Sequence, residues 1–216
     1  GQSRRVSMEV EAKVWRIRHL VYPDEVGPLE EVPREIHQAY LANSVKYDIG
    51  HPRIQAAVRE AVGEEKNPWW IARRIYRYLI EKLEYELAGG WNTAPAILER
   101  GNGSCSEYTF TFIALCRAAG LPARYAGSVV VRGDDASYDD VFHRWAEVYL
   151  PRRGWVPVDP SGGDQQSPAG RASCFGELDN RFLITTLGGG DSEYLGWDYN
   201  GSQRWTSHGR AKIRLE

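Results

Sequence analysis

The spacing of hydrophobic and polar residues separates the chain into a helical part and a later part of strands. Apolar residues recur at helical spacing in three segments, and a proline opens each segment, where it favours the first turn of a helix. These segments, residues 33–42, 52–62 and 68–83, are predicted to be helices. A fourth, short helix is predicted to begin at Thr93 and to end before Gly101.

Alternation of apolar and polar residues predicts strands in the rest of the chain. It first occurs near the N-terminus, where Val6, Met8, Val10, Ala12 and Val14 alternate with polar neighbours. The predicted strands are residues 6–17, 123–132, 142–150 and 155–159, with weaker strands near 181–187 and 210–215. Because most strands follow the helices rather than alternating with them, the predicted fold class is α+β.

Length and charge narrow the range of functions. A chain of 216 residues is long enough for one sizeable domain, and we expect residues 1–216 to form a single domain. The 27 Lys and Arg residues nearly balance the 29 Asp and Glu residues, so the net charge of −2 gives no electrostatic signature of a nucleic-acid-binding protein. No apolar run approaches the roughly 18 residues that indicate a membrane span. The sequence does not indicate an oligomeric state.

The cellular compartment stays open. Residues 1–13 lack the apolar stretch of a signal peptide. The start of the chain is interpreted as a truncated N-terminus, so a signal or an anchor upstream of Gly1 could have been removed.

The cysteines and acidic residues do not predict a metal site. Cys105, Cys116 and Cys174 are an odd number without C-x-x-C spacing, which argues against a disulfide framework and against a zinc site. The acidic residues 133–140 lack the ligand pattern of an EF-hand calcium site and are interpreted as a solvated loop beside a cleft. We therefore expect no cofactor, and at least one thiol that is free.

Cys105 lies where the sequence predicts the beginning of a central helix. Ser104, followed three residues later by Glu107, forms a capping box, so the helix should begin at Cys105. Unpaired backbone N–H groups and the helix dipole favour a thiolate at this position, which turns the thiol into a nucleophile. An inert, buried thiol is the alternative interpretation, and we adopt it for Cys116, which lies in the middle of the apolar helix.

His143 and Asp159 lie on two predicted strands that a short turn connects. We expect Tyr149 to pair with Trp155 across this turn. This register makes His143 the diagonal neighbour of Asp159 on one face, roughly 7–8 Å away at the backbone. A shift by one residue would turn Asp159 to the other face. Together with Cys105, the two residues then fit the roles of nucleophile, general base and orienting acid.

These residues belong to motifs by which the sequence resembles the transglutaminase-like superfamily of papain-like enzymes. The matching motifs are residues 103–107 (GSCSE), 114–124 (ALCRAAGLPAR), 143–151 (HRWAEVYLP) and 154–160 (GWVPVDP). The resemblance is strong over residues 68–161 and weak in the flanks, where residues 1–67 form a helical extension and residues 162–216 carry strands and loops.

The resemblance implies a papain-like fold, in which a central helix with Cys105 packs on an antiparallel sheet with His143 and Asp159. It implies that Cys105 is the nucleophile, that His143 acts as general base and acid, and that Asp159 orients the imidazole. Members of the superfamily also place a donor for the oxyanion upstream of the cysteine. Tyr85 is our first candidate for this donor and Trp91 the second, beside the backbone N–H of Cys105.

These residues and the resemblance together predict thiol-dependent acyl transfer on an amide bond. The expected substrate is a peptide, a protein or another amide, because fold and triad define the chemistry and not the substrate. Water is the simpler acceptor, and the sequence shows no feature of a second substrate, so we favour a hydrolase, either a cysteine peptidase or an amidase. Two alternatives stay open: a protein-glutamine transglutaminase, and a catalytically silent module that binds a peptide or a glycan.

Overall fold

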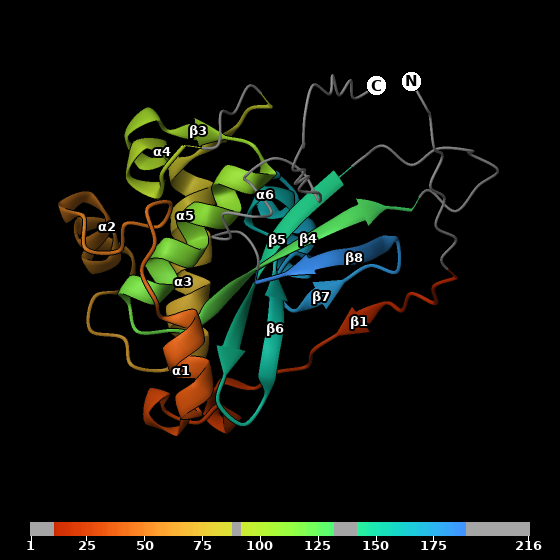
Figure 1. The fold of residues 1–216 in the computed structure, drawn as a ribbon, viewed down its shortest axis with the longest axis horizontal. Coiled ribbons are helices and arrows are strands. Elements are labelled where there is room, and N and C mark those ends of the chain that lie inside the picture. The colour runs from red at the N-terminus through yellow and green to blue at the C-terminus, as the bar shows by residue number, and fades with distance from the viewer. Residues whose placement is uncertain (1–10, 88–91, 132–141, 189–216) are drawn as a thin grey trace, which may run out of the picture.

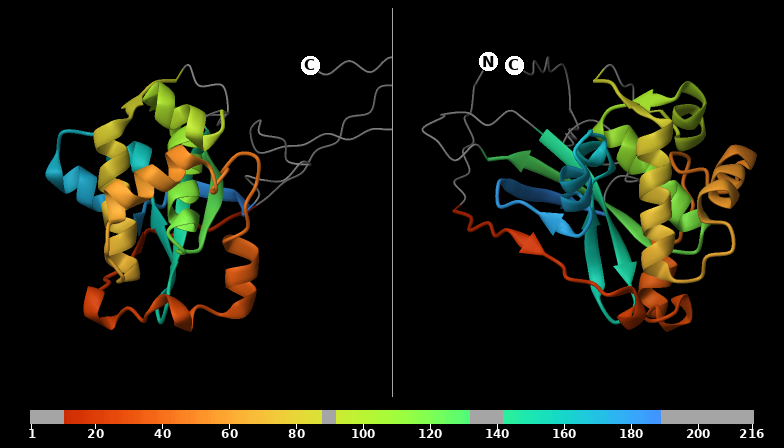
Figure 2. Two further views of the ribbon diagram at one scale, coloured as in Figure 1. Left: turned by 90° about the vertical axis from the view of Figure 1, so that its left-hand side faces the viewer. Right: turned by 180° about the vertical axis from the view of Figure 1, so that it is seen from behind.

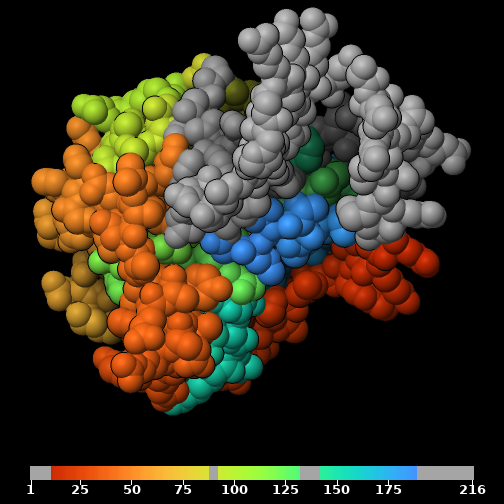
Figure 3. Space-filling model, in the orientation of Figure 1, coloured from red at the N-terminus to blue at the C-terminus, as the bar shows by residue number. Residues whose placement is uncertain are grey.

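The helices gather on one side of the molecule and the main sheet lies on the other (Figure 1). The computed structural model describes residues 11–87, 92–131 and 142–188. Several helices precede the strands of the antiparallel sheet, which confirms the predicted α+β class. Figure 3 shows the same division on the surface, where the orange helical segments lie on one side and the strands β1 (Ile17–Arg18, red) and β8 (Phe182–Leu187, blue) lie toward the other.

The sequence explains where the helices of the helical layer begin. They are α1 (Arg34–Tyr40), α2 (Pro52–Val62), α3 (Pro68–Lys82), α4 (Ala94–Arg100) and α5 (Cys105–Ala118). In α3, Oδ1 of Asn67 accepts the backbone N–H of Trp69 at 3.0 Å, and Pro68 occupies the first turn, where no N–H is needed. Helix α5 contacts α2, α3 and α4 on one side and the sheet on the other, and Figure 2 shows it at the centre of the molecule. It is therefore the predicted central helix.

The main sheet is antiparallel throughout. Its strands are β4 (Ala123–Val130), β5 (Phe142–Leu150), β6 (Gly154–Val158) and β8, in the order β6-β5-β4-β8. The shorter elements are η1 (Pro23–Glu25), η2 (Leu29–Glu31), β2 (Glu84–Tyr85), β3 (Asn102–Gly103), α6 (Pro160–Gly163), α7 (Pro168–Ser173) and β7 (Glu177–Leu178). The strands of the main sheet confirm the corresponding sequence predictions, and their ends lie within two residues of the predicted ends.

The register between β5 and β6 is the predicted one. Tyr149 pairs with Trp155, and the ladder continues to the pair of Ala146 and Val158. Asp159 follows directly after this last paired residue. The short turn fixes the register because it leaves few ways to connect two adjacent antiparallel strands.

The two faces of the sheet bury different clusters. Alternate residues of β5 pack with the helices in the main core: Ala146, Val148 and Leu150. Trp145 belongs to a smaller cluster on the other face, with Phe182 packed against it. Successive side chains of a strand point to opposite faces of the sheet. His143 therefore lies on the same face as Trp145, and Arg144 lies on the face that packs against the helices.

The predicted N-terminal strand over residues 6–17 is wrong for most of its described part. Residues 11–16 form no strand, and the two residues of β1 pair with β7 as a short antiparallel ladder. Trp15 is 64% exposed, so the alternation does not correspond to a buried face here. Residues 6–10 and the strand predicted near 210–215 lie outside the described residues.

Candidate active site

Cys105 is the first residue of α5, where the capping box predicted it. The carboxylate of Glu107 accepts the backbone N–H of Ser104 at 3.0 Å. Gly103 allows this close approach, because a Cβ at its position would lie 2.8 Å from the Cβ of Glu107. Cys105 is 8% exposed. The first N–H groups of a helix have no acceptor within the helix, so the amide of Cys105 is suited to bind an anionic oxygen.

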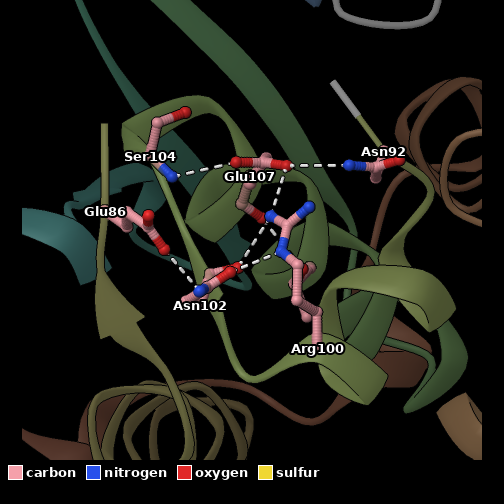
Figure 4. Close-up of polar contacts among 7 residues, drawn as sticks. Glu86, Asn92, Arg100, Asn102, Ser104 and Glu107 are labelled. Carbon is pink, nitrogen blue, oxygen red and sulfur yellow. Dashed lines mark hydrogen bonds and ion pairs between the residues drawn. The ribbon is translucent and has the colours of Figure 1, made fainter. Parts of the chain in front are cut away.

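A polar network supports the turn before α5 (Figure 4). Its labelled members are Glu86, Asn92, Arg100, Asn102, Ser104 and Glu107. The buried carboxylate of Glu107 accepts from Nη2 of Arg100 at 2.8 Å. The side chain of Asn102 accepts from Arg100 and donates to Glu86. Because β2 pairs with β3 in parallel, the network connects this turn to the strand that carries Tyr85.

His143 and Asp159 come from neighbouring strands and meet directly. Nε2 of His143 lies 2.6 Å from Oδ2 of Asp159. The imidazole also lies against two aromatic rings, with centroid distances of 5.3 Å to Phe182 and 6.2 Å to Trp145. These contacts restrict the ring to an orientation in which Nδ1 is the nitrogen left to face Cys105.

Asp159 has a second set of partners in the short helix α6. Its Oδ1 accepts the backbone N–H of Gly162 at 2.8 Å and the hydroxyl of Ser161 at 2.9 Å. Gly162 permits this geometry, because a Cβ there would lie 2.6 Å from Oδ2 of Asp159. The carboxylate therefore caps α6 with one oxygen and binds His143 with the other.

Cys105 and His143 line the same cleft, where the imidazole can bind the thiol, and the three groups shift one another's pKa values. Burial raises the pKa of the Cys105 thiol, but the hydrogen bond and positive charge of His143 outweigh burial and lower this pKa below its usual value. Burial lowers the pKa of His143, but Asp159 and Cys105 raise it to about 10. Burial opposes the charge of Asp159, and His143 nevertheless holds the pKa of that carboxyl below its usual value. The arrangement favours a thiolate beside an imidazolium.

Cys105 and His143 line a cleft of about 520 Å³. The other residues that line it are Tyr85, Leu87, Ser104, Ser106, Val130, Phe142, Arg144, Asp159, Gly162, Arg181 and Phe182. Tyr85, our first oxyanion candidate, thus lies in the same cleft as Cys105, and it is 50% exposed. Partial burial and the neighbouring charge of Cys105 raise the pKa of Tyr85, which keeps its hydroxyl protonated and able to donate. Trp91, the second candidate, lies outside the described residues.

The sequence analysis missed several residues of the cleft. Phe182 and Arg181 reach it because β8 pairs with β4, a contact between distant segments that no local pattern indicates. The sequence does contain an indication that Arg144 is unusual, because it is a charged residue at a position that the alternation of β5 assigns to the buried face. It is 2% exposed.

The described part of the chain contains neither a cluster of metal ligands nor a membrane-spanning helix. No group of three or more His, Cys, Asp or Glu residues there is arranged to hold a metal ion. The acidic residues 133–140 lie outside that part. Within residues 11–87, 92–131 and 142–188, no helix has the length and apolar character needed to cross a membrane.

Comparison with known sequences finds transglutaminase-like relatives. The sequence pattern of the transglutaminase-like superfamily matches residues 55–160. An uncharacterized protein of Haemophilus influenzae is 31% identical over 162 residues, which cover 62% of this chain and 44% of that protein. A protein-glutamine gamma-glutamyltransferase of Pseudomonas aeruginosa is 28% identical over 123 residues, which cover 52% of this chain and 18% of that protein. The chain thus spans less than half the length of either relative.

Solved structures share the fold. A candidate cysteine protease from Cytophaga hutchinsonii has a TM-score of 0.57 at 20% identity, over 78% of this chain and 53% of that chain. The periplasmic domain of TgpA from Pseudomonas aeruginosa has a TM-score of 0.50 at 22% identity, over 60% of this chain and 48% of that chain. These likenesses bear on the fold, which is the expected papain-like and transglutaminase-like one. The matched pattern and the related sequences thus support the expected resemblance to the transglutaminase-like superfamily.

Proposed function

We propose that this chain catalyses thiol-dependent acyl transfer on amide bonds and that water is its main acceptor. One arrangement carries the proposal: Cys105 and His143 line the wall of one cleft, and Nε2 of His143 lies 2.6 Å from Oδ2 of Asp159. This arrangement suits a nucleophile, a general base and acid, and an orienting carboxylate. The match of residues 55–160 to the transglutaminase-like superfamily supports the same chemistry.

In the first step, the thiolate of Cys105 attacks the carbonyl carbon of the amide and forms a carbon–sulfur bond. His143 transfers the proton on Nδ1 to the nitrogen of the leaving amine, and the carbon–nitrogen bond breaks. The product of this step is a thioester on Cys105, and the imidazole of His143 is neutral. Asp159 stabilises the imidazolium before the step and holds Nδ1 toward the reacting atoms.

In the second step, a water molecule attacks the carbon of the thioester. Nδ1 of His143 takes a proton from this water, the carbon–sulfur bond breaks, and the acid leaves while Cys105 becomes a thiolate again. In both steps the carbonyl oxygen gains negative charge. We assign its stabilisation to the backbone N–H of Cys105 and to the hydroxyl of Tyr85, because both groups lie at the same cleft.

Transfer to an amine is the second candidate function. The relative in Pseudomonas aeruginosa is a protein-glutamine gamma-glutamyltransferase, and such an enzyme uses the same thioester with an amine in place of water. A binding module that retains the fold without turnover is the third. The lowered pKa of Cys105 argues for a reactive thiol and against such a module.

Alkylation of the thiols tests the reactive cysteine. We expect iodoacetamide to label Cys105 near neutral pH much faster than a model peptide thiol, as measured by peptide mapping and mass spectrometry. Cys116 is an internal control, because it is completely buried and burial raises its pKa well above the usual value. Labelling of Cys105 no faster than the model thiol would contradict the proposal and favour the binding module.

An amide library tests the acyl transfer itself. We expect the wild-type protein to release amines from a subset of the library and to carry the matching acyl group on Cys105 after rapid acid quenching. Cys105→Ala should abolish both signals, and Cys116→Ala should retain them. Addition of a primary amine at millimolar concentration then distinguishes water from an amine as the acceptor. We expect the free acid to remain the main product. Transfer of most acyl groups to the amine would establish a transferase instead.

A further inference from the structure

The charged groups of the cleft include two arginines that the proposed reaction does not use. In the described part of the chain, the charged or ionisable groups that line it are Cys105, His143, Asp159, Arg144, Arg181 and Tyr85. The thiolate and the imidazolium cancel each other, and Asp159 supplies one negative charge against two from the arginines. The hydroxyl of Tyr85 is neutral, so the described groups that line the cleft carry a net positive charge around the nucleophile.

Arg144 supplies a positive charge that the protein holds in a fixed place. It is 2% exposed, and its charge acts on Tyr125, which is itself 5% exposed on the adjacent strand β4. Its charge lowers the pKa of the Cys105 thiol, after the larger effect of His143. A cation shielded from water in this way acts on a ligand more strongly than an exposed cation does, because water screens it less.

Arg181 supplies the exposed charge of the cleft. It directly precedes β8, and its backbone carbonyl accepts the N–H of Val131 at 2.6 Å, which fixes the start of that strand. Its guanidinium lies 5.9 Å from the ring centroid of Phe182, the same residue that packs against His143. An exposed guanidinium can form paired hydrogen bonds with a carboxylate.

We propose that the cleft selects amide substrates that carry a carboxylate close to the scissile bond, with Arg181 as its contact and Arg144 as a fixed charge behind it. The inference rests on the proposed function, because it places this carboxylate next to an amide that Cys105 attacks. The apolar lining by Leu87, Val130 and Phe142 suits the uncharged part of such a substrate.

A pair of small alkylating reagents tests the selectivity at Cys105 itself. Iodoacetate and iodoacetamide both alkylate the thiolate with loss of iodide, but iodoacetate carries a carboxylate. We measure the ratio of the two rate constants and divide it by the same ratio for glutathione. A change in the thiolate fraction affects both reagents equally and cancels, so the normalised ratio reports attraction of the anion alone.

Single substitutions show whether the arginines cause this attraction. We expect a wild-type ratio well above one, a fall of about twofold to fivefold in Arg181→Gln and in Arg144→Gln, and recovery in Arg144→Lys. Arg77→Gln, an exposed residue of α3, is the control with the same change of charge and should match the wild type. Equal ratios in the wild type and in both cleft variants would overturn the proposal. If Arg144→Gln does not fold, the ratio measured for Arg181→Gln still tests whether the cleft attracts the anion.

Binding without reaction separates this proposal from the proposed function. The Cys105→Ala variant is titrated with three matched compounds and followed by NMR at the amides of residues 142–144. N-acetylaspartate α-amide has a side-chain carboxylate, N-acetylasparagine has a terminal carboxylate, and N-acetylasparagine amide has neither. We expect saturating shifts with at least one acid and none with the neutral amide, and the acid that binds identifies the source of the carboxylate. Equal shifts with all three, or none, would refute anion selection even if Cys105 is reactive.

Discussion

Substitution of Asp159 by Asn removes one negative charge and retains the shape of the side chain. Oδ1 of the new residue can still accept from Gly162 and Ser161, so the cap on α6 remains. The other end of the side chain changes from an acceptor to an amide donor toward Nε2 of His143. This donor favours a neutral imidazole and removes the charge that stabilises the imidazolium.

The size of the loss follows from the contact that is removed. A hydrogen bond to a charged partner contributes about 1.5–3 kcal/mol, which corresponds to a rate that is about 10-fold to 150-fold lower. We therefore expect kcat/KM to fall by about this factor. Because the cap is retained, the free energy of unfolding should change by less than about 1 kcal/mol, which corresponds to about 2–4 °C in Tm for a chain of this size.

The pH profile gives a second, independent measure of the same contact. In the wild type, His143 remains protonated below its pKa of about 10, so the basic limb of the kcat/KM profile should lie near that pH. Asp159 is the largest influence that raises this pKa, after burial has lowered it. The basic limb of Asp159→Asn should therefore move to lower pH. The assay is amide turnover across pH with thermal unfolding in parallel, and Asp179→Asn, an exposed residue, is the control of equal charge.

One combination of results would refute this role of Asp159. If turnover and its pH profile were unchanged while Tm fell by many degrees, the carboxylate would act only as the cap of α6. A change of both quantities in Asp179→Asn as well would point to a general effect of charge.

Three further predictions concern neighbouring residues. Tyr85→Phe should lower kcat by about 10²-fold with little change in KM, and an unchanged kcat would exclude Tyr85 as the oxyanion donor. Glu107→Gln should lower the free energy of unfolding by about 2 kcal/mol at neutral pH. This is less than the roughly 3–5 kcal/mol for loss of a fully buried ion pair, because the partner, Arg100, is 36% exposed. Chemical denaturation measures the change, and Glu99→Gln, at an exposed position, is the control. Because the folded pKa of Glu107 is lowered, this difference should vanish as the pH falls through that pKa, and a constant difference would contradict the ion pair. Tyr108→Phe, which loses a hydrogen bond of 2.6 Å to Asp164, should lower Tm by a few degrees in thermal unfolding, and an unchanged Tm would show that this bond contributes nothing.

The start of α5 and the register of β5 and β6 could be predicted because local chemistry determines both. The capping box needs only Ser104 and Glu107, which are three residues apart. The pairing of Tyr149 with Trp155 needs only a short turn between two alternating strands. Signals of this kind do not depend on the rest of the fold.

Other features depend on contacts that the local sequence does not contain. Trp15 lies in a segment with a clear alternation, yet that segment finds no core to cover and stays largely exposed. Phe182 reaches His143 only because β8 pairs with β4, and Tyr85 reaches the cleft only because β2 pairs with β3. The alternation of β5 indicates that Arg144 is a charged residue at a buried position. Its effect on the Cys105 thiol could not be predicted, because that requires the position of Cys105 in the fold.

The place of the cleft follows from the position of His143 near the beginning of its strand. Helix α5 packs on one face of the sheet, while the alternation of β5 puts His143 and Trp145 on the other face. In the middle of a strand, the sheet would separate an imidazole on that face from a thiol at the helix. The ladder with β6 ends at the pair of Ala146 and Val158, so β6 does not continue beside His143, and the imidazole can reach the cleft that Cys105 lines. Arg144, the next residue, reaches the cleft from the opposite face, so one strand end brings both the imidazole and the buried charge to it.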